Sequence, residues 1–411
     1  MTQRHWPIGV LIVLAFAVLG CGLAPDKPIT SPHAVVVVKP QEGGGVSYLF
    51  AANKYLGKVY RVNLDTLAID EITVGRKPEN IAASPDGYLV AVANNADKSI
   101  TVIRAATLAK KTVVTGRRPS DIGFSPDGNW LGVANSENET VSLIDAHSGK
   151  LWNNIWVGGG PAALAFDPTS RFMAVACYDE DAVKIVSVQE KKVVTAWSNS
   201  QVINRPQAVI FSNGAIRGET LLFVGCHEDP YVENGGSYAE SIAVLHLSPT
   251  WADDPEEYTP QMQIIRAGPN PRGFLWNHAG DKLLAINHVF EDWDSNYNVD
   301  TLSLIDVSGA IAEEQRFVTG HNPVAAALAP EEDVVAVANK GGASITIVDL
   351  TDNSSFDVST IARPFAVAFT PSGHKVIVVH DSALMPLSVV DLASGSSRVV
   401  YDSLSMNDWI E

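Results

Sequence analysis

The sequence is poor in cysteine and in basic residues. Its 411 residues include only three cysteines, Cys21, Cys177 and Cys226, and so few exclude a scaffold held together by disulfides. The 29 lysines and arginines stand against 46 acidic residues, which gives a formal net charge of −17. A chain this acidic is not expected to bind nucleic acid or anionic lipid headgroups. It suits a basic protein partner or bound cations.

Several motifs of known chemistry are also missing. The sequence contains no CxxCH for covalent haem, no CxxC or HExxH metal spacing, no GxSxG nucleophile turn and no phosphate-binding glycine loop. No reaction can therefore be predicted from motifs. Whether the protein is an enzyme stays open, and a binding role is favoured.

The first twenty residues differ from the rest. A basic start at Arg4 is followed by an apolar run over residues 8–19 and then by Cys21, which is the order of a secretory signal. The run is too short to span a bilayer comfortably, and no later segment is long and apolar enough to do so. The sequence VLGC at 18–21 resembles the lipobox of bacterial lipoproteins. The alternative is an ordinary signal peptide with an incidental cysteine.

The lipobox resemblance implies that Cys21 is lipidated and becomes the mature N-terminus. Residues 1–20 are then a signal peptide, and residues 21–46, rich in proline and glycine, form a tether. We expect an exported protein in the periplasm or at the surface, anchored in the cell envelope through its lipid alone. The outer membrane is favoured where the source has one.

Two stretches of the chain are nearly the same. Residues 75–94 read GRKPENIAASPDGYLVAVAN, and residues 116–135 read GRRPSDIGFSPDGNWLGVAN. Four short apolar runs separated by turn sequences make up each repeat of about 40 residues, which is typical of a propeller blade with four antiparallel strands. We therefore predict an all-β fold, a single β-propeller over residues 47–411. The proline that leads the first strand recurs at Pro78, Pro119, Pro161, Pro206, Pro271, Pro323 and Pro364.

The number of blades depends on the first repeat. The second and third strands can be counted eight times, beginning with 48–53 and 58–64, whereas the proline-led inner strand occurs seven times. Residues 34–39 (AVVVVK) would supply the missing inner strand. We predict eight blades; the alternative is seven, closed by an irregular C-terminal segment.

The order of Gly-x-x-Pro, Ser-Pro-Asp-Gly and a strand ending in Asn resembles the YVTN family of propeller repeats over residues 47–400. The resemblance is strong in the repeats that begin at Gly75, Gly116 and Gly320, and weak over 206–300. YVTN-like propellers are similar to propeller lactonases, to the haem d1 domain of nitrite reductase and to a subunit of quinohaemoprotein amine dehydrogenase. The resemblance therefore implies a site at the mouth of the central channel if the protein is an enzyme or redox subunit.

Insertions interrupt the fifth and sixth repeats. Residues 227–241 and 288–300 follow the second strand of neighbouring blades, and residues 248–262 form a third insertion. The first two belong on the face that carries the Gly-x-x-Pro loops, where repeat proteins often bind their partners. Acidic and amide residues alternate in the second insertion and suit Ca²⁺, which takes six to eight oxygen ligands; the alternative is a solvated polar loop. The candidate ligands are Asp292, Asp294, Asn296, Asn298 and Asp300.

Other candidate site residues lie at equivalent places in different blades. Where most blades end the second strand with Asn, three have Cys177, Cys226 and His380, and thiol with imidazole would suit copper or zinc. The alternatives are buried thiols and loop histidines without a metal, or a disulfide between the two cysteines. The expected ligand-binding residues at the channel mouth are Arg118, Arg205, Arg272, Arg363, His227 and His288.

We favour a lipid-anchored propeller that binds an envelope protein or a small anionic ligand through the face with the insertions. The alternative is a propeller enzyme or redox subunit with a lactonase-like, haem d1-like or amine dehydrogenase-like site at the channel mouth. The propeller fold alone does not decide between these functions.

Overall fold

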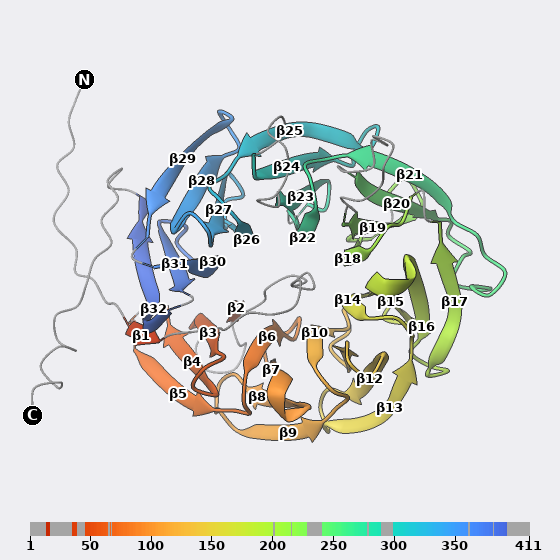
Figure 1. Ribbon diagram of the computed structural model, residues 1–411, viewed down its shortest axis with the longest axis horizontal. Helices are drawn as coiled ribbons and strands as arrows, with labels where there is room; N and C mark the ends of the chain where they lie inside the picture. The colour runs from red at the N-terminus through yellow and green to blue at the C-terminus, as the bar shows by residue number, and fades with distance from the viewer. Residues whose placement is uncertain are drawn as a thin grey trace, which may run out of the picture.

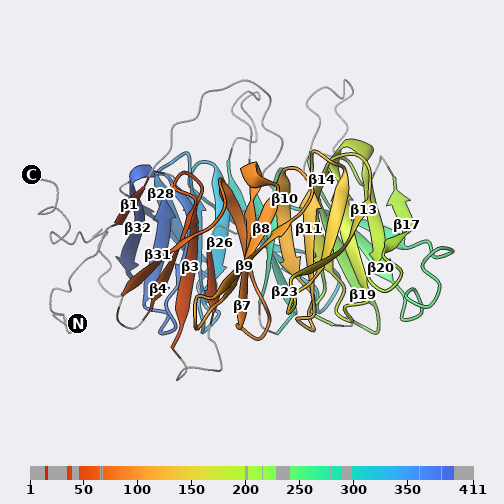
Figure 2. The same ribbon diagram turned by 90° about the horizontal axis from the view of Figure 1, so that it is seen from below.

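A computed structural model describes residues 14–16, 35–38, 46–64, 66, 68–199, 202–214, 216–227, 241–277, 279–288, 299–360, 362–380 and 382–392. They form eight four-stranded antiparallel sheets around a central axis (Figure 1). From the side, the strands run between two faces of a flat ring (Figure 2). The predicted all-β propeller with eight blades is confirmed. Among the described residues, no helix has the length and apolar character needed to cross a membrane.

Each blade contributes one strand to each of four concentric positions. The inner strands are β2 (Val35–Val38), β6 (Pro78–Ala83), β10 (Pro119–Phe124), β14 (Pro161–Phe166), β18 (Pro206–Phe211), β22 (Pro271–Trp276), β26 (Pro323–Leu328) and β30 (Pro364–Phe369). The second strands are β3 (Tyr48–Asn53), β7 (Leu89–Asn94), β11 (Trp130–Asn135), β15 (Phe172–Cys177), β19 (Thr220–Cys226), β23 (Lys282–Asn287), β27 (Val334–Asn339) and β31 (Lys375–His380).

The third strands are β4 (Lys58–Asn63), β8 (Ser99–Arg104), β12 (Thr140–Asp145), β16 (Ala182–Ser187), β20 (Ser241–Leu247), β24 (Thr301–Asp306), β28 (Ser344–Asp349) and β32 (Ser382–Asp391). The outer strands are β5 (Ile69–Thr73), β9 (Lys110–Val114), β13 (Lys150–Trp156), β17 (Lys192–Ser198), β21 (Gln261–Arg266), β25 (Ala312–Val318), β29 (Ser354–Ser359) and, in the eighth blade, β1 (Leu14–Phe16). Two short 3₁₀ helices, η1 (Asn95–Asp97) and η2 (Tyr178–Glu180), follow β7 and β15.

Segments near the N-terminus complete the first and the last blade. β2 pairs with β3 and supplies the inner strand of blade 1, as the run of valines at 35–38 predicts. The propeller therefore begins at Val35, inside the range assigned to the tether, and not at residue 47. β1 pairs with β32 at the edge of blade 8, although residues 14–16 lie inside the predicted signal peptide.

Apolar side chains fill the space between neighbouring blades. Between blades 3 and 4, Leu143 packs in one cluster with Phe166 and Met173, and full burial of such a side chain contributes about 1.5–3 kcal/mol. At Gly132 of β11 an added Cβ would lie 2.6 Å from the Met173 sulfur. The close approach of the two sheets therefore requires glycine at this position.

Polar side chains of the inner strands also link one blade to the next. Ser120 Oγ donates to the Pro161 carbonyl at 3.0 Å, and Gln207 Nε2 donates to the Pro271 carbonyl at 3.2 Å. Asp121 is buried, and its carboxyl oxygens accept the backbone N–H of Ile122 and that of Leu164 in blade 4, each at 2.9 Å. Burial raises the pKa of Asp121 to about 7 in spite of these two donors.

A glycine and an asparagine are in contact in four blades. Gly75 donates its N–H to Asn94 Oδ1 at 3.1 Å, and Asn94 Nδ2 donates to Thr101 Oγ1 at 2.9 Å. A Cβ on Gly75 would lie 2.6 Å from Asn94 Cγ. The loop before the inner strand is thereby fixed to the second and third strands. The same contact recurs for Gly116 with Asn135, Gly268 with Asn287 and Gly320 with Asn339.

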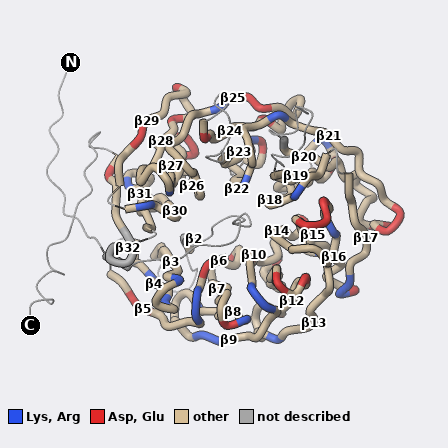
Figure 3. Tube along the Cα trace, viewed as in Figure 1, with Lys and Arg blue, Asp and Glu red and all other residues tan. Residues whose placement is uncertain are grey.

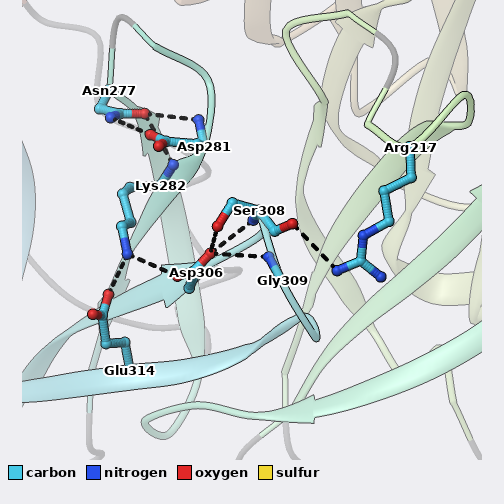
Figure 4. A network of polar contacts seen from close by, with 8 residues as sticks. All are labelled: Arg217, Asn277, Asp281, Lys282, Asp306, Ser308, Gly309 and Glu314. Carbon is cyan, nitrogen blue, oxygen red and sulfur yellow. Dashed lines mark hydrogen bonds and ion pairs between the residues drawn. The ribbon is translucent and has the colours of Figure 1, made fainter.

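Acidic residues order the turns between third and outer strands, which lie on the face opposite to the loops that precede the inner strands (Figure 4). Asp306 Oδ1 accepts the N–H and the Oγ–H of Ser308, each at 2.7 Å, and Lys282 Nζ lies 2.9 Å from Asp306 Oδ2. The hydrogen bonds from Ser308 and Lys282 hold the pKa of Asp306 well below its usual range. Arg217 of blade 5 donates to the Ser308 carbonyl at 3.4 Å, which ties this turn to the neighbouring blade.

The glycine–asparagine contact makes a prediction about stability. Gly116→Ala places a Cβ 2.6 Å from Asn135 Cγ, and overpacking of this kind costs about 1–3 kcal/mol in the free energy of unfolding. Urea unfolding of wild type and Gly116→Ala measures this difference in the free energy of unfolding. Gly309→Ala is the control, because nothing lies within 4 Å of a Cβ there. Equal stability of Gly116→Ala and Gly309→Ala would show that the contact between Gly116 and Asn135 does not hold the loop.

Candidate functional site

The loops that precede the inner strands and those that follow the second strands emerge together; we call their side of the ring the loop face. The residue after a second strand donates its N–H to a carbonyl of the loop before the inner strand. This bond joins Asn95 to Lys77 at 2.9 Å, Ser136 to Arg118 at 3.1 Å and Lys340 to Asn322 at 2.8 Å. Both predicted loop insertions, at 227–241 and 288–300, begin from this bonded layer.

The most connected polar group of the loop face is the buried carboxylate of Asp300. Its Oδ1 lies 2.9 Å from His288 Nδ1, its Oδ2 lies 3.2 Å from His321 Nδ1, and Oδ2 also accepts the Asn322 N–H at 2.7 Å. A carboxylate only accepts, so each imidazole donates from Nδ1 and, when neutral, keeps its lone pair on Nε2. Asp300 thus fixes the tautomer of two histidines at once.

The two imidazoles differ in their environment. His288 is buried, whereas the side chain of His321 is 45% exposed, and their ring centroids lie 6.3 Å apart. Burial lowers the pKa of His288 and the charge of Arg272 lowers it further, while the hydrogen bond that His288 donates to Asp300 acts in the opposite direction. His288 is therefore neutral at pH 7. The imidazole of His321 is held at Nδ1 by Asp300 and is exposed to solvent.

The predicted calcium site falls largely outside the described residues, which exclude Asp292, Asp294, Asn296 and Asn298. Asp300 is described, and its oxygens already accept the three hydrogen bonds given above. Within the described part of the chain, no three His, Cys, Asp or Glu side chains gather in a way that would hold a metal ion. The calcium prediction stays untested.

The predicted arginines occupy two kinds of position. Arg118, Arg205 and Arg363 each directly precede an inner-strand proline, whereas Arg272 follows one and is half-buried beside His288. Arg205 lies over the Tyr178 ring at 6.0 Å, and its backbone N–H binds Asp181 at 2.8 Å. The structure thus brings Arg272 and His288 together in one cluster, while the other three arginines belong to separate blades.

His227, Cys177 and Cys226 do not form a metal site. His227 is buried and packs edge-on against Tyr178 with centroids 5.7 Å apart. Both thiols are free, and burial raises the pKa of Cys177 to about 12 and that of Cys226 to about 11. The disulfide hypothesis is therefore wrong, whereas the copper or zinc hypothesis finds no cluster of ligands among the described residues and stays a prediction. Each thiol lies near a loop carbonyl, 3.5 Å for Cys177 to Val157 and 3.6 Å for Cys226 to Val202.

His380 replaces asparagine in blade 8. Its Nδ1 lies 3.0 Å from the Ala362 carbonyl, and its Nε2 lies 2.7 Å from Ser388 Oγ. Both ring nitrogens of His380, a candidate for copper or zinc in the sequence, thus have hydrogen-bond partners within the blade. Burial lowers the pKa of His380 to about 4.

Sequence reasoning missed His321 and the role of Asp300. In the sequence, Asp300 is only the last member of an alternating acidic run, and His321 lies in the repeated Gly-x-x-Pro motif at Gly320–Pro323, which predicts a blade and no site. The only available signal was a histidine at a position where two other repeats have arginine, at Arg76 and Arg117.

Residues 104–211 match the family model described as "Lactonase, 7-bladed beta-propeller". The match spans the outer strand of blade 2, blades 3 and 4 and the inner strand of blade 5, and it leaves out the Asp300 cluster. No curated protein matches the sequence.

Solved structures share the propeller fold. The chain is similar to hydrazine synthase of Kuenenia stuttgartiensis, with a TM-score of 0.58 and 17% identity over 76% of this chain and 95% of that chain. A functionally unknown protein from Desulfotomaculum acetoxidans has a TM-score of 0.56 and 13% identity over 74% and 92%. The dihydro-heme d1 dehydrogenase NirN, solved with DHE, has a TM-score of 0.57 and 15% identity over 81% and 75%. Identities this low support a common fold and no common activity.

The buried histidine of blade 8 makes stability depend on pH. Its pKa of about 4 in the folded state lies below the usual histidine value of 6.5, so the folded state binds fewer protons, and its stability falls as the pH drops from 6.5 towards 4. The shift corresponds to at most about 3 kcal/mol. His380→Asn, with the residue that ends five other second strands, should remove this part of the pH dependence.

Urea unfolding at pH 7.5 and pH 5 measures the effect for wild type and variant. His374→Asn is the control, since His374 is exposed. If His380→Asn kept the full wild-type loss of stability on acidification, the buried neutral imidazole would not be its source.

The Asp300 carboxylate makes a second prediction. In Asp300→Asn the amide nitrogen would replace Oδ2 and face the N–H of Asn322 and the Nδ1–H of His321. A buried donor left facing donors costs about 1–3 kcal/mol. The variant also loses the group that raises the pKa of His288, so His288 should titrate at a still lower pH. Histidine Cε1–H signals in NMR follow the titration, and Asp253→Asn at an exposed site is the control.

Proposed function

We propose that the protein is an exported, lipid-anchored propeller that binds an envelope protein or a small anionic ligand through the loop face of blades 5 to 7. The observation that carries the proposal is the Asp300 cluster. A buried carboxylate that orients two imidazoles beside an arginine is a costly arrangement, and in blades 2 and 3 the loop layer forms through Asn95–Lys77 and Ser136–Arg118 without such a cluster. Its exposed member, His321, presents the cluster to solvent.

The two insertions support the same face. They follow β19 and β23, the second strands of blades 5 and 6, and His288 and Asp300 stand at the two ends of the second insertion. Repeat proteins often acquire a binding side in this way: neighbouring loops on one face become longer while the repeated fold stays the same. We therefore place the ligand or partner above these blades.

Lipid attachment is part of the proposal. Processing at Cys21 would remove residues 1–20 and with them β1, so that blade 8 of the mature protein would keep β30, β31 and β32. The tether between Cys21 and Val35 would then hold the ring close to the membrane, with no other membrane contact required.

A second candidate function is an enzyme or redox subunit with its site at the same cluster. The observation that favours it is the pairing of His321 with Asp300, because a carboxylate on Nδ1 is the arrangement that prepares an imidazole to accept a proton at Nε2. The partial match to the lactonase family model supports the same candidate. An absorption spectrum and elemental analysis of the purified protein distinguish a redox subunit from a binding protein. The redox subunit requires a stoichiometric chromophore or metal.

Site-specific photo-crosslinking tests the binding proposal. Benzoyl-phenylalanine in place of His321 should give a discrete adduct with an envelope protein in membranes of the source organism. The same replacement of the exposed Asp352, in a turn on the opposite face, should give none. Equal adducts at both positions, or no adduct at His321 together with no small ligand in the purified protein, would contradict the proposal.

A further inference from the structure

Blade 8 has an outer edge whose partner comes from the predicted signal peptide. Its third strand, β32, pairs with β1 through Leu387 opposite Leu14, and the register shifts at Phe16. β1 has three residues, whereas the outer strands of the other seven blades have five to seven. Processing at Cys21 would leave the peptide groups along this edge without β1. An open edge of this kind invites pairing with other chains, and proteins normally cover it.

The chain around and beyond β32 repeats the end of blade 7. Residues 344–359 read SITIVDLTDNSSFDVS and contain β28, a turn and β29, and residues 386–401 read PLSVVDLASGSSRVVY. The two stretches align without a gap and place the end of β32, Asp391, at the end of β28, Asp349. Residues 393–411 lie outside the described residues. In the alignment, residues 396–401 stand where β29 stands, at the outer strand.

The described part of blade 8 follows blade 7 as far as the turn. Leu350 donates its N–H to the Asp333 carbonyl at 2.7 Å, and Leu392 donates its N–H to the His374 carbonyl at 2.9 Å. The residue directly before the outer strand has positive φ at Gly149, Lys191 and Asn353. Gly395 holds this position in the alignment, and glycine adopts positive φ without steric cost. The turn that leads to an outer strand is therefore encoded in blade 8.

The apolar residue of the outer strand also falls in register. In three blades, the ninth residue after the end of the third strand is buried and lies opposite the residue four positions before that end. These pairs are Ile72 with Val59, Val113 with Ile100 and Val358 with Ile345. The same count from Asp391 reaches Val400 and places it opposite Leu387. Leu387 is the residue that pairs with Leu14, so Val400 and Leu14 compete for one position.

A basic residue at 398 is compatible with an outer strand of this ring. The outer strands carry either charge: β9 contains Lys110 and Lys111, and β25 contains Glu313 and Glu314, as the colours along the rim show (Figure 3). The equivalent of Arg398 in blade 7 is Phe356, which is 53% exposed. An arginine at such a position keeps its charge in solvent, where it costs little.

We infer that residues 396–401 dock on the outer edge of β32 and form the fourth strand of blade 8 in the processed protein. They take the place of β1, because the edge of a strand pairs with one neighbour only. Val400 then occupies the position of Leu14. The C-terminal part of the chain thereby completes the propeller and closes the edge to strands of other molecules. The inference rests on the proposed function, in that removal of residues 1–20 opens the edge.

Disulfide crosslinking tests the strand pairing in protein purified after expression of the full chain. In the inferred register Val389 lies opposite Arg398, as Ile347 lies opposite Phe356 in blade 7. Opposed residues of antiparallel strands lie within the Cα separation of a disulfide, about 4.4–6.8 Å. The pair Val389→Cys, Arg398→Cys should therefore crosslink under mild oxidation. The control pair Val389→Cys, Val399→Cys should not, because successive side chains of a strand point to opposite faces.

Amide hydrogen exchange measures whether Val400 holds the docked strand. Val400→Asp places a carboxylate at the position of buried Val358, so exchange over residues 396–401 should become at least about tenfold faster. Val399→Asp is the matched control, since its equivalent in blade 7 is the exposed Asp357. Its exchange over the same residues should change less than about twofold.

The N-terminal mass of the same preparations separates this inference from the proposed function. A chain that begins at Cys21 and shows neither the crosslink nor slow exchange over residues 396–401 would overturn the docked strand and leave the lipid anchor standing. A chain that begins at Met1 would contradict the lipid anchor, and the crosslink then decides whether residues 396–401 or β1 cover the edge. Equal exchange in wild type, Val399→Asp and Val400→Asp would also overturn the inference.

Discussion

The contact between a loop glycine and a strand-end asparagine sets the geometry of the loop face. Asn94 accepts the N–H of Gly75 and donates to the third strand, so one amide joins three segments of a blade. The amide reaches all three only because glycine has no Cβ. The near-identity of residues 75–94 and 116–135 is therefore a packing requirement. The carbonyl before the proline also meets the N–H beyond the second strand, with positive φ before the proline; blades 4 and 5 keep this second bond without the glycine–asparagine contact.

Blade 5 replaces both members of this contact. Cys226 ends its second strand, and the loop position three residues before Pro206 holds Ile203 in place of glycine; both side chains are buried in one apolar cluster. Blade 4 replaces only the asparagine, by Cys177, and keeps Gly158 at the loop position. From the sequence, the two cysteines at aligned positions suggested metal chemistry. The structure gives them apolar neighbours and raised pKa values, which suit packing and not ligation.

The repeated motif made the propeller fold predictable from the sequence, whereas the side-chain cluster around Asp300 could not be predicted from it. The strands at 48–53 and 58–63 and the inner strand at 35–38 follow from local patterns of apolar residues. The register adds one finding: Val35 pairs with Ala51 as Ile81 pairs with Val92, so β2 is equivalent to β6. In the sequence, Pro32 precedes Val35 by three residues, as Pro78 precedes Ile81. The Asp300 cluster could not be predicted in this way, because His288, Asp300 and His321 are brought together by the closure of two loops, and no spacing in the sequence encodes that distance.

The fixed loop layer also explains where the chain is free to vary. Glycine, asparagine and proline hold the backbone, so the stability of a blade depends little on the residues between them. These intervening positions include Arg118 directly before Pro119, Arg272 directly after Pro271, and His321 directly after Gly320. Each blade can thus change the charge that it presents at the loop face without changing its fold. On the opposite face, acidic side chains such as Asp306 accept hydrogen bonds that order their own turns. The partner that we propose is therefore expected at the loop face, from which the two insertions begin.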